Sequence, residues 1–302
     1  MSDRNPHLQA ALLMLGSTLF FGAMAVTIRL ASESLSTYQI AFFRNFFGLL
    51  ALLPFLRHSW PGVLRTRQLP RYLLRSAIGV VSMLCGFWAI GHLPMAQAIS
   101  LSYSTPLFVT ILAAIWLGEI VRRRRWTAVL LGFLGVLVIV RPGTEGFSAG
   151  SLVAVSAAAL SSVVAIQIKQ LSRVDPPDTI VFWTYVFWVP LSLVPALFQW
   201  RWPGGMEWLW LAAIGVFGTG GQLLWTRALK LGEVSALTPI GFMQLPLVSV
   251  LAWVLFDERI DRWTVLGAAI ILVANAYIAR REARAAKRQA SIAACEAAEP
   301  GT

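Results

Sequence analysis

The chain has 302 residues, of which 57% are hydrophobic and 13% are charged, and its mean hydropathy is +0.69. A soluble domain carries roughly 45–50% apolar and about 25% charged residues, so the composition excludes a soluble globular protein, a disordered chain and a nucleic-acid-binding arm. We therefore expect an all-α polytopic membrane protein. Its formal net charge of +11 then belongs to loops beside anionic lipid.

Ten apolar stretches are long enough to cross a bilayer, because a helix needs about 20 apolar residues for a hydrocarbon core roughly 30 Å thick. They are residues 8–30, 37–56, 73–91, 94–118, 126–141, 150–168, 179–199, 208–226, 234–256 and 263–279. None shows the alternation that a β-barrel strand needs. The first stretch has no small-residue cleavage site before the next polar break, which predicts a retained span and not a signal peptide.

The basic residues predict the orientation of these ten helices. With both termini placed in the cytoplasm, 19 of the 25 Lys and Arg residues fall in cytoplasmic segments and five fall outside. This asymmetry is the one that the positive-inside rule describes. We expect an integral protein of the plasma membrane, in a bacterium the inner membrane, with both termini cytoplasmic.

An internal repeat relates the two halves of the sequence. Residues 95–140 align with residues 235–279 at an offset of about 135 to 140 residues. The alignment pairs Glu119 with Glu258, and it also brings a Pro, a Trp and a Gly of one copy onto or near their counterparts in the other. These matched landmarks predict a duplicated unit.

Each copy of the unit holds five spans, and five is odd. The second copy therefore enters the membrane from the opposite face, which predicts ten transmembrane helices as two inverted five-helix repeats. Inverted repeats are an architecture of secondary transporters. The predicted domains are the first repeat at 1–145 (spans 1–5), the second repeat at 146–280 (spans 6–10), and a basic cytoplasmic tail at 281–302.

One pattern occurs in both copies: a Pro in mid-span, small residues, Gly-Glu or Asp-Glu, a short basic link, Arg-Trp, and a Gly-rich span. It resembles the EamA domain of the drug/metabolite transporter superfamily, over nearly the whole chain. The stretches AFFRN, LSYSTPLF and RRWTAVLLGFLGVLVIVRPG are most similar to the subgroup that includes S-adenosylmethionine carriers. The resemblance implies a secondary carrier of a small organic metabolite, such as an amino acid, a vitamin-like solute or an S-adenosylmethionine-like solute.

Polar residues inside three of the spans are the candidates for substrate contact. Large amides that faced lipid would lack hydrogen-bond partners, so we expect the glutamines to face a cavity. For the serines, contact with substrate and hydrogen bonding between helices are equally open. The candidates are Gln97, Ser100, Tyr103 and Ser104 in the fourth span, Gln222 in the eighth, and Thr238 and Gln244 in the ninth.

The fourth and ninth spans also contain Pro106 and Pro246. A proline inside a helix lacks an N–H and frees a carbonyl one turn earlier. We therefore predict that both spans bend there, and that the fourth offers a carbonyl near residue 102 to a cavity.

Three large side chains within spans have two possible roles each. Arg44 either binds a substrate carboxylate or phosphate through its guanidinium group, or it bonds helix-end carbonyls or extends to the headgroups and holds the second span in place. Trp88 and Trp225, at nearly equivalent positions in the two halves, either line a cavity for a planar or cationic solute or pack in the core.

The acidic residues at the ends of the repeated spans are expected to be structural. Glu119 should pair with a residue of the basic run 122–125, and Glu258 with Arg262. Small residues such as Gly135 and Gly267 in spans five and ten suggest close helix packing, and with it a homodimer formed through those spans.

Two other functional classes compete with a carrier. An intramembrane enzyme would need clustered catalytic groups, yet the three histidines, His7, His58 and His92, lie in the N-terminal segment and loops, where they make no metal site. A passive channel usually has charged rings or a carbonyl filter, and the sequence suggests neither. We expect a small-molecule substrate and a lipid bilayer as partners, with no cofactor and no nucleic acid.

Overall fold

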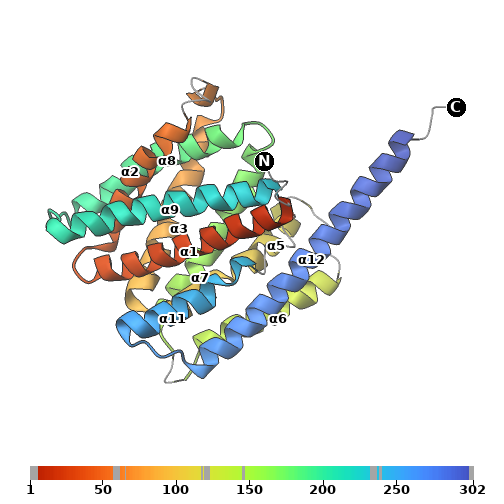
Figure 1. Cartoon of the computed structure of the whole chain (residues 1–302). Coiled ribbons are helices and arrows are strands. Elements are labelled where there is room, and N and C mark those ends of the chain that lie inside the picture. The colour runs from red at the N-terminus through yellow and green to blue at the C-terminus, as the bar shows by residue number, and fades with distance from the viewer. Residues whose placement is uncertain are drawn as a thin grey trace.

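The computed structural model describes residues 6–56, 62–64, 66–116, 118, 123–144, 147–231, 237 and 240–298. These residues form helices and no strand. Within the described ranges, eight helices are long and apolar enough to cross a membrane, and the apolar helices Trp126–Val140 and Gln244–Phe256 are shorter. The chain is thus an all-helical polytopic membrane protein, as the composition predicts (Figure 1).

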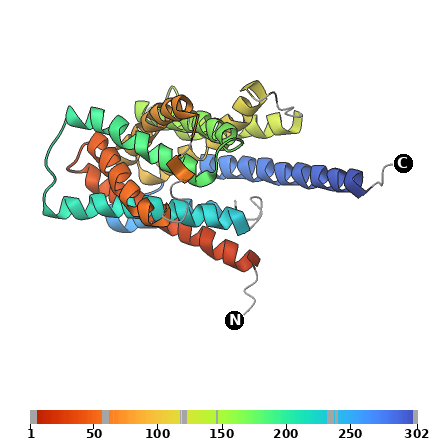
Figure 2. The same ribbon diagram turned by 90° about the horizontal axis from the view of Figure 1, so that it is seen from above.

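The helices follow the predicted stretches closely, with one addition at the C-terminal end, where the last helix continues to Ala298 (Figure 2). They are α1 (Pro6–Ser32), α2 (Thr37–Leu56), the 3-10 helix η1 (Gly62–Leu64), α3 (Leu69–His92), α4 (Met95–Ser102), α5 (Thr105–Trp116), α6 (Arg123–Val140), α7 (Ala149–Leu171), α8 (Pro177–Leu197), α9 (Gly205–Leu231), α11 (Gln244–Phe256) and α12 (Arg262–Ala298). Figure 1 shows that α1 begins, and α12 ends, at the same end of the bundle.

Packing between helices respects the repeat. In the repeat, α1, α2 and α3 correspond to α7, α8 and α9. The contact of α1 with α9 therefore corresponds to that of α7 with α3, and the contact of α2 with α9 corresponds to that of α8 with α3. All four pairs are in contact. The pairs α2–α8 and α6–α12 each join equivalent helices (Figures 1 and 2). Two copies of one five-helix unit produce this exchange symmetry.

The α6–α12 pair depends on glycine. A methyl group added at Gly135 would lie 2.7 Å from the carbonyl oxygen of Gly267, so only two glycines allow this approach. Gly132 lies against Leu107 of α5 in the same way. These small residues are therefore used inside one chain, and a homodimer through the other faces of α6 and α12 stays a prediction.

The fourth span is interrupted where a bend was expected. Helix α4 ends at Ser102, Tyr103 and Ser104 form a turn, and α5 begins at Thr105. Pro106 is the second residue of α5, where a helical N–H needs no partner. The carbonyl of Ser102 accepts a 2.8 Å hydrogen bond from the Thr105 hydroxyl. A side chain next to the interruption therefore provides a donor for this carbonyl.

The ninth span has a matching interruption at residues 242–243, just before α11. Pro246 is the third residue of α11 and is exposed. In both copies the proline thus lies in the first turn of a second short helix and not in the middle of one long helix, which corrects the predicted bend. The part of this span before residue 240 is described only at Leu237.

Candidate functional site

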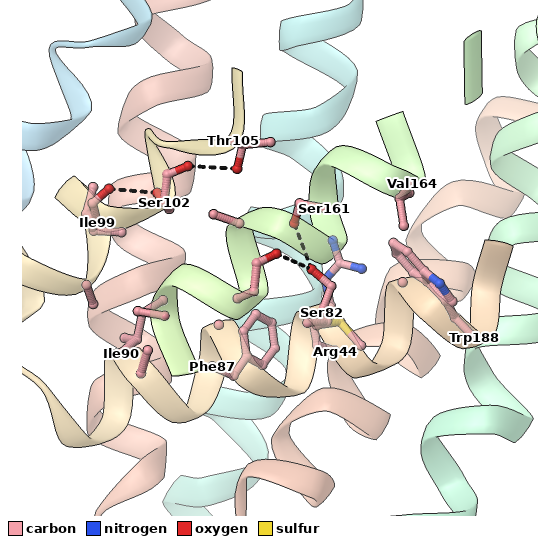
Figure 3. Close-up of a pocket in the computed structure, with 18 residues that line it drawn as sticks. Arg44, Ser82, Phe87, Ile90, Ile99, Ser102, Thr105, Ser161, Val164 and Trp188 are labelled. Carbon is pink, nitrogen blue, oxygen red and sulfur yellow. Dashed lines mark hydrogen bonds between the residues drawn. The ribbon is translucent and has the colours of Figure 1, made fainter. Parts of the chain in front are cut away.

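A cavity of about 330 Å³ lies among α2, α3, α4, α5, α7 and α8 (Figure 3). We call it the central cavity. It is open because the facing surfaces of α3 and α7 carry small side chains, which leave space between two otherwise packed helices. These small lining residues are Gly79, Gly86 and Ala89 of α3 and Ala154, Ala157 and Ala158 of α7.

Arg44 of α2 is the charged side chain of the central cavity. Its Nη1 atom donates a 3.0 Å hydrogen bond to Oδ1 of Asn45, and Asn45 in turn donates a 3.1 Å bond to the Ser192 hydroxyl of α8. The guanidinium carbon lies 5.5 Å from the ring centre of Tyr185 and 5.3 Å from that of Trp188, within range of cation–π attraction. Among the described residues Arg44 has no acidic partner.

Four hydroxyl groups line the cavity opposite a largely apolar surface. Ser82 donates to the Ala157 carbonyl at 2.8 Å and lies 2.7 Å from the hydroxyl of Ser161. Ser102 donates to the Ile99 carbonyl at 2.7 Å, and Thr105 donates to Ser102 as described above. Because the protons of Ser82, Ser102 and Thr105 are engaged with backbone carbonyls, their oxygens keep lone pairs for the cavity.

Aromatic side chains border the same space. Trp188 and Phe87 both line the cavity, and Figure 3 shows the Arg44 guanidinium in the space that Ser82, Ser161 and Trp188 border. The indole Nε1 of Trp188 is buried, lies close to Gly79, and has no hydrogen-bond partner among the described residues. The cavity therefore offers one cation, several acceptors and aromatic surface.

The predicted polar stripe of the fourth span does not line this cavity. Gln97, Ser100 and Ser104 are buried against neighbouring helices. Gln97 donates to the Ser151 hydroxyl of α7 at 3.0 Å, whereas the two serines donate to α4 carbonyls one turn back. The cavity face of α4 is formed instead by Ala98, Ile99 and Ser102.

Tyr103 connects the interruption to the other half of the chain. Its hydroxyl donates to the Gly241 carbonyl at 3.2 Å, and its own carbonyl accepts from the Asn275 amide of α12 at 2.6 Å. The ring also contacts Phe242 edge to face. Tyr103 thus joins the two interrupted spans and lies outside the cavity lining.

The remaining predicted substrate contacts are spread over the bundle. Trp88 stacks on His92 with ring centres 4.3 Å apart, Trp225 is exposed on the surface of α9, and Gln222 and Gln244 are half-buried away from the cavity lining. Thr238 and Glu119 lie outside the described residues.

A second charged group lies where α1, α3 and α11 end, which we call the Arg29 end. Arg29 Nη2 pairs with Glu258 Oε1 at 2.8 Å, and Nη1 donates to the Gly91 carbonyl at 2.5 Å and the Ile90 carbonyl at 3.1 Å. Glu258 also accepts the Met95 amide at 2.8 Å. Glu258 is therefore in an ion pair, but with Arg29 and not with the expected Arg262, which lies over the ring of Trp263.

Few of the residues that line the cavity stand out in the sequence. Ser82 and Ser161 are single hydroxyls in apolar spans, and Trp188 is one of several tryptophans in its half. They lie in one cavity because α3 packs against α7 and α2 packs against α8. Of the predicted contact residues that the structure describes, only Arg44 is found in the cavity lining.

Comparison with known proteins agrees with this arrangement. The EamA-like transporter family matches residues 8–141 and again residues 148–280. A riboflavin transporter of Vibrio cholerae is 32% identical over 300 residues, which cover 97% of this chain and 100% of that protein. An S-adenosylmethionine uptake transporter of Rickettsia felis is 30% identical, covering 84% of this chain and 87% of its own length.

Two further similarities concern an exporter and a fold. A pseudopaline exporter of Pseudomonas aeruginosa is 30% identical over 89% of this chain and 95% of its own length. One crystal structure of a protein matches with a TM-score of 0.62 at 21% identity, over 90% of this chain and 98% of that one, which shows a shared fold alone. The two family matches and the apolar helices identify an integral membrane transporter. This chain belongs to the EamA-like transporter family.

Proposed function

We propose that the protein is a secondary carrier that binds a small organic metabolite in the central cavity and moves it across the bacterial inner membrane by alternating access. The observation that carries this proposal is the cavity itself. Its volume of about 330 Å³ falls in the range of pockets for small molecules, roughly 300–1,000 Å³. It also lies between helices of the two halves, where inverted repeats form substrate sites.

The Arg29 end supplies the device that closes one side. The ion pair and the backbone hydrogen bonds of Arg29 join α1 to the α3–α4 link and to the link between α11 and α12. At the repeat's offset of about 140 residues, Glu119 corresponds to Glu258, and Lys169 in the last turn of α7 corresponds to Arg29 in the last turn of α1. The inverted topology places the two ends on opposite sides of the membrane. Alternating access then amounts to breaking the contact at the Arg29 end while the opposite end of the bundle closes.

The distribution of basic residues supports an orientation with both termini in the cytoplasm. With both termini cytoplasmic, the Arg29 end faces the periplasm and the basic run 122–125 faces the cytoplasm. The tail that extends α12 then lies on the cytoplasmic side, where anionic headgroups attract its Lys and Arg residues.

The relatives suggest which cargo to try first. They are named as transporters of riboflavin, S-adenosylmethionine and pseudopaline, so we propose a cargo of that size, an amino-acid-like, S-adenosylmethionine-like or vitamin-like solute. A carrier needs no catalytic cluster, and we propose no enzymatic activity.

Uptake by liposomes containing the purified protein tests the proposal. We expect saturable, protein-dependent movement of radiolabelled S-adenosylmethionine or riboflavin, and faster exchange when unlabelled solute is present on the other side. A current that rises without saturation as solute is increased would indicate a channel instead. No movement of any member of a wide metabolite panel, in either direction, would contradict a carrier.

A further inference from the structure

The charge of Arg44 is balanced by no acidic group in the described part of the chain. Three other arginines there pair with an acidic group: Arg29 with Glu258, Arg141 with Asp261 at 3.0 Å, and Arg201 with Glu207. Buried Arg75 of α3 has no acidic partner among the described residues either, but it donates to the Thr184 hydroxyl and does not line the cavity. A guanidinium group inside a membrane protein is costly to leave without an anion. The two aromatic faces and the Asn45 oxygen offset part of that cost, and most of its N–H groups stay available.

The hydroxyl groups of the cavity have the opposite character. Ser82 commits its proton to the Ala157 carbonyl, so the Ser161 hydroxyl, 2.7 Å away, donates to Ser82. The protons of Ser102 and Thr105 are likewise committed to carbonyls. Besides Arg44 the cavity therefore presents acceptors, and its described lining includes no carboxylate.

We propose that the cargo is an organic anion that also carries N–H or O–H donors. Its carboxylate or phosphate binds the free N–H groups of Arg44, its donors bind the Ser82–Ser161 pair, and its apolar or planar part lies against Phe87 and Trp188. This proposal rests on the proposed function, since it names the cargo class of the same cavity. Cargo without an anionic group would leave the guanidinium unpaired and lose affinity.

Binding of matched probe pairs to the purified protein tests this inference. Each pair differs in the anionic group: riboflavin 5′-phosphate and riboflavin, S-adenosylmethionine and its carboxamide, and a set of amino acids and their amides. We expect that the charged member of at least one pair binds about tenfold more tightly or better, as one charge-assisted hydrogen bond allows. Arg44→Gln should abolish this preference, and Arg44→Lys should keep part of it.

Arg141→Gln is the matched control, because it removes an arginine whose partner is Asp261 and which does not line the cavity. It should keep the full preference for the charged probes. Equal affinities within every pair, no binding of any charged probe, or an unchanged preference in Arg44→Gln overturns the inference.

The two proposals fail in different ways. Saturable transport of neutral solutes together with equal affinities within the pairs would leave the carrier standing and remove the anionic cargo. Tight, Arg44-dependent binding of an anion without transport in liposomes would support the anionic ligand and contradict the carrier.

Discussion

Arg29 and Arg44 are both arginines in apolar helices, but their surroundings differ. At one end of the bundle, Arg29 forms an ion pair with a carboxylate and donates hydrogen bonds to backbone carbonyls that accept no helical N–H. Arg44 meets one amide oxygen and two aromatic rings beside a cavity. Arg29 thus uses its guanidinium group to hold helices together, whereas most N–H groups of Arg44 have no partner in the described part of the chain, as the proposed anionic cargo requires.

The largest expected effect concerns stability without cargo. Arg29→Gln leaves the Glu258 carboxylate without its counter-ion, so we expect a loss of about 2–4 kcal/mol in the free energy of unfolding. Arg44→Gln removes a charge that has no counter-ion, and this gain offsets the cation–π attraction that is lost. We therefore expect the free energy of unfolding to change by less than about 1 kcal/mol. Unfolding of both variants in detergent measures this. Equal losses would show that Arg44 is a structural residue.

Coupling between Arg29 and Glu258 should be the next largest effect. A double-mutant cycle with Arg29→Gln and Glu258→Gln should give an interaction free energy of about 1–3 kcal/mol. The same cycle with Arg44→Gln and Glu258→Gln is the control and should be additive within about 0.5 kcal/mol. A strong coupling in the control pair would mean that the two arginines belong to one network.

Loss of a cavity hydroxyl should weaken cargo binding moderately. Ser161→Ala removes one acceptor, and we expect an increase in Kd of about fivefold. Ser100→Ala is the matched control, because the Ser100 hydroxyl is buried and donates to the Ala96 carbonyl. If Ser100→Ala weakens binding as much as Ser161→Ala does, the cargo binds elsewhere.

The smallest effect on binding is expected at the glutamines. Gln97 hydrogen-bonds Ser151 outside the cavity, and Gln244 also lies away from its lining. Gln97→Ala and Gln244→Ala should therefore change Kd by less than about twofold, although Gln97→Ala should cost about 1 kcal/mol of stability. A large loss of affinity in either variant would restore the fourth- and ninth-span site that the sequence suggests.

Much of the fold could be predicted because each span carries its own signal. Apolar length marks the helices, and the matched Glu119 and Glu258 mark the repeat. The interruptions were harder to place, since Pro106 and Pro246 fit both a bent helix and the first turn of a new one. The turn at residues 103–104 decides between these, and it depends on contacts of Tyr103 with the other half of the chain.

The cavity could be predicted only in part, because its lining depends on which helices meet. Gln97 and Ser100 lie on α4, whose packing buries them, with Gln97 against α7, and Ser104 lies buried in the turn that follows this helix. Arg44 was identifiable since an arginine within a span is rare and costly. The partner of Glu258 was missed because Arg29 is distant in sequence, whereas Arg262 is only four residues away.

Accessibility of one cysteine in the cavity tests alternating access most directly. In a chain with Cys85→Ser and Cys295→Ser, the variant Ala157→Cys places a thiol in the cavity lining. A membrane-impermeant maleimide should label it slowly from the side that the Arg29 end faces, and Glu258→Gln should raise that rate severalfold by weakening the closed end. Labelling from that side at a rate that Glu258→Gln leaves unchanged would contradict the gate at Arg29.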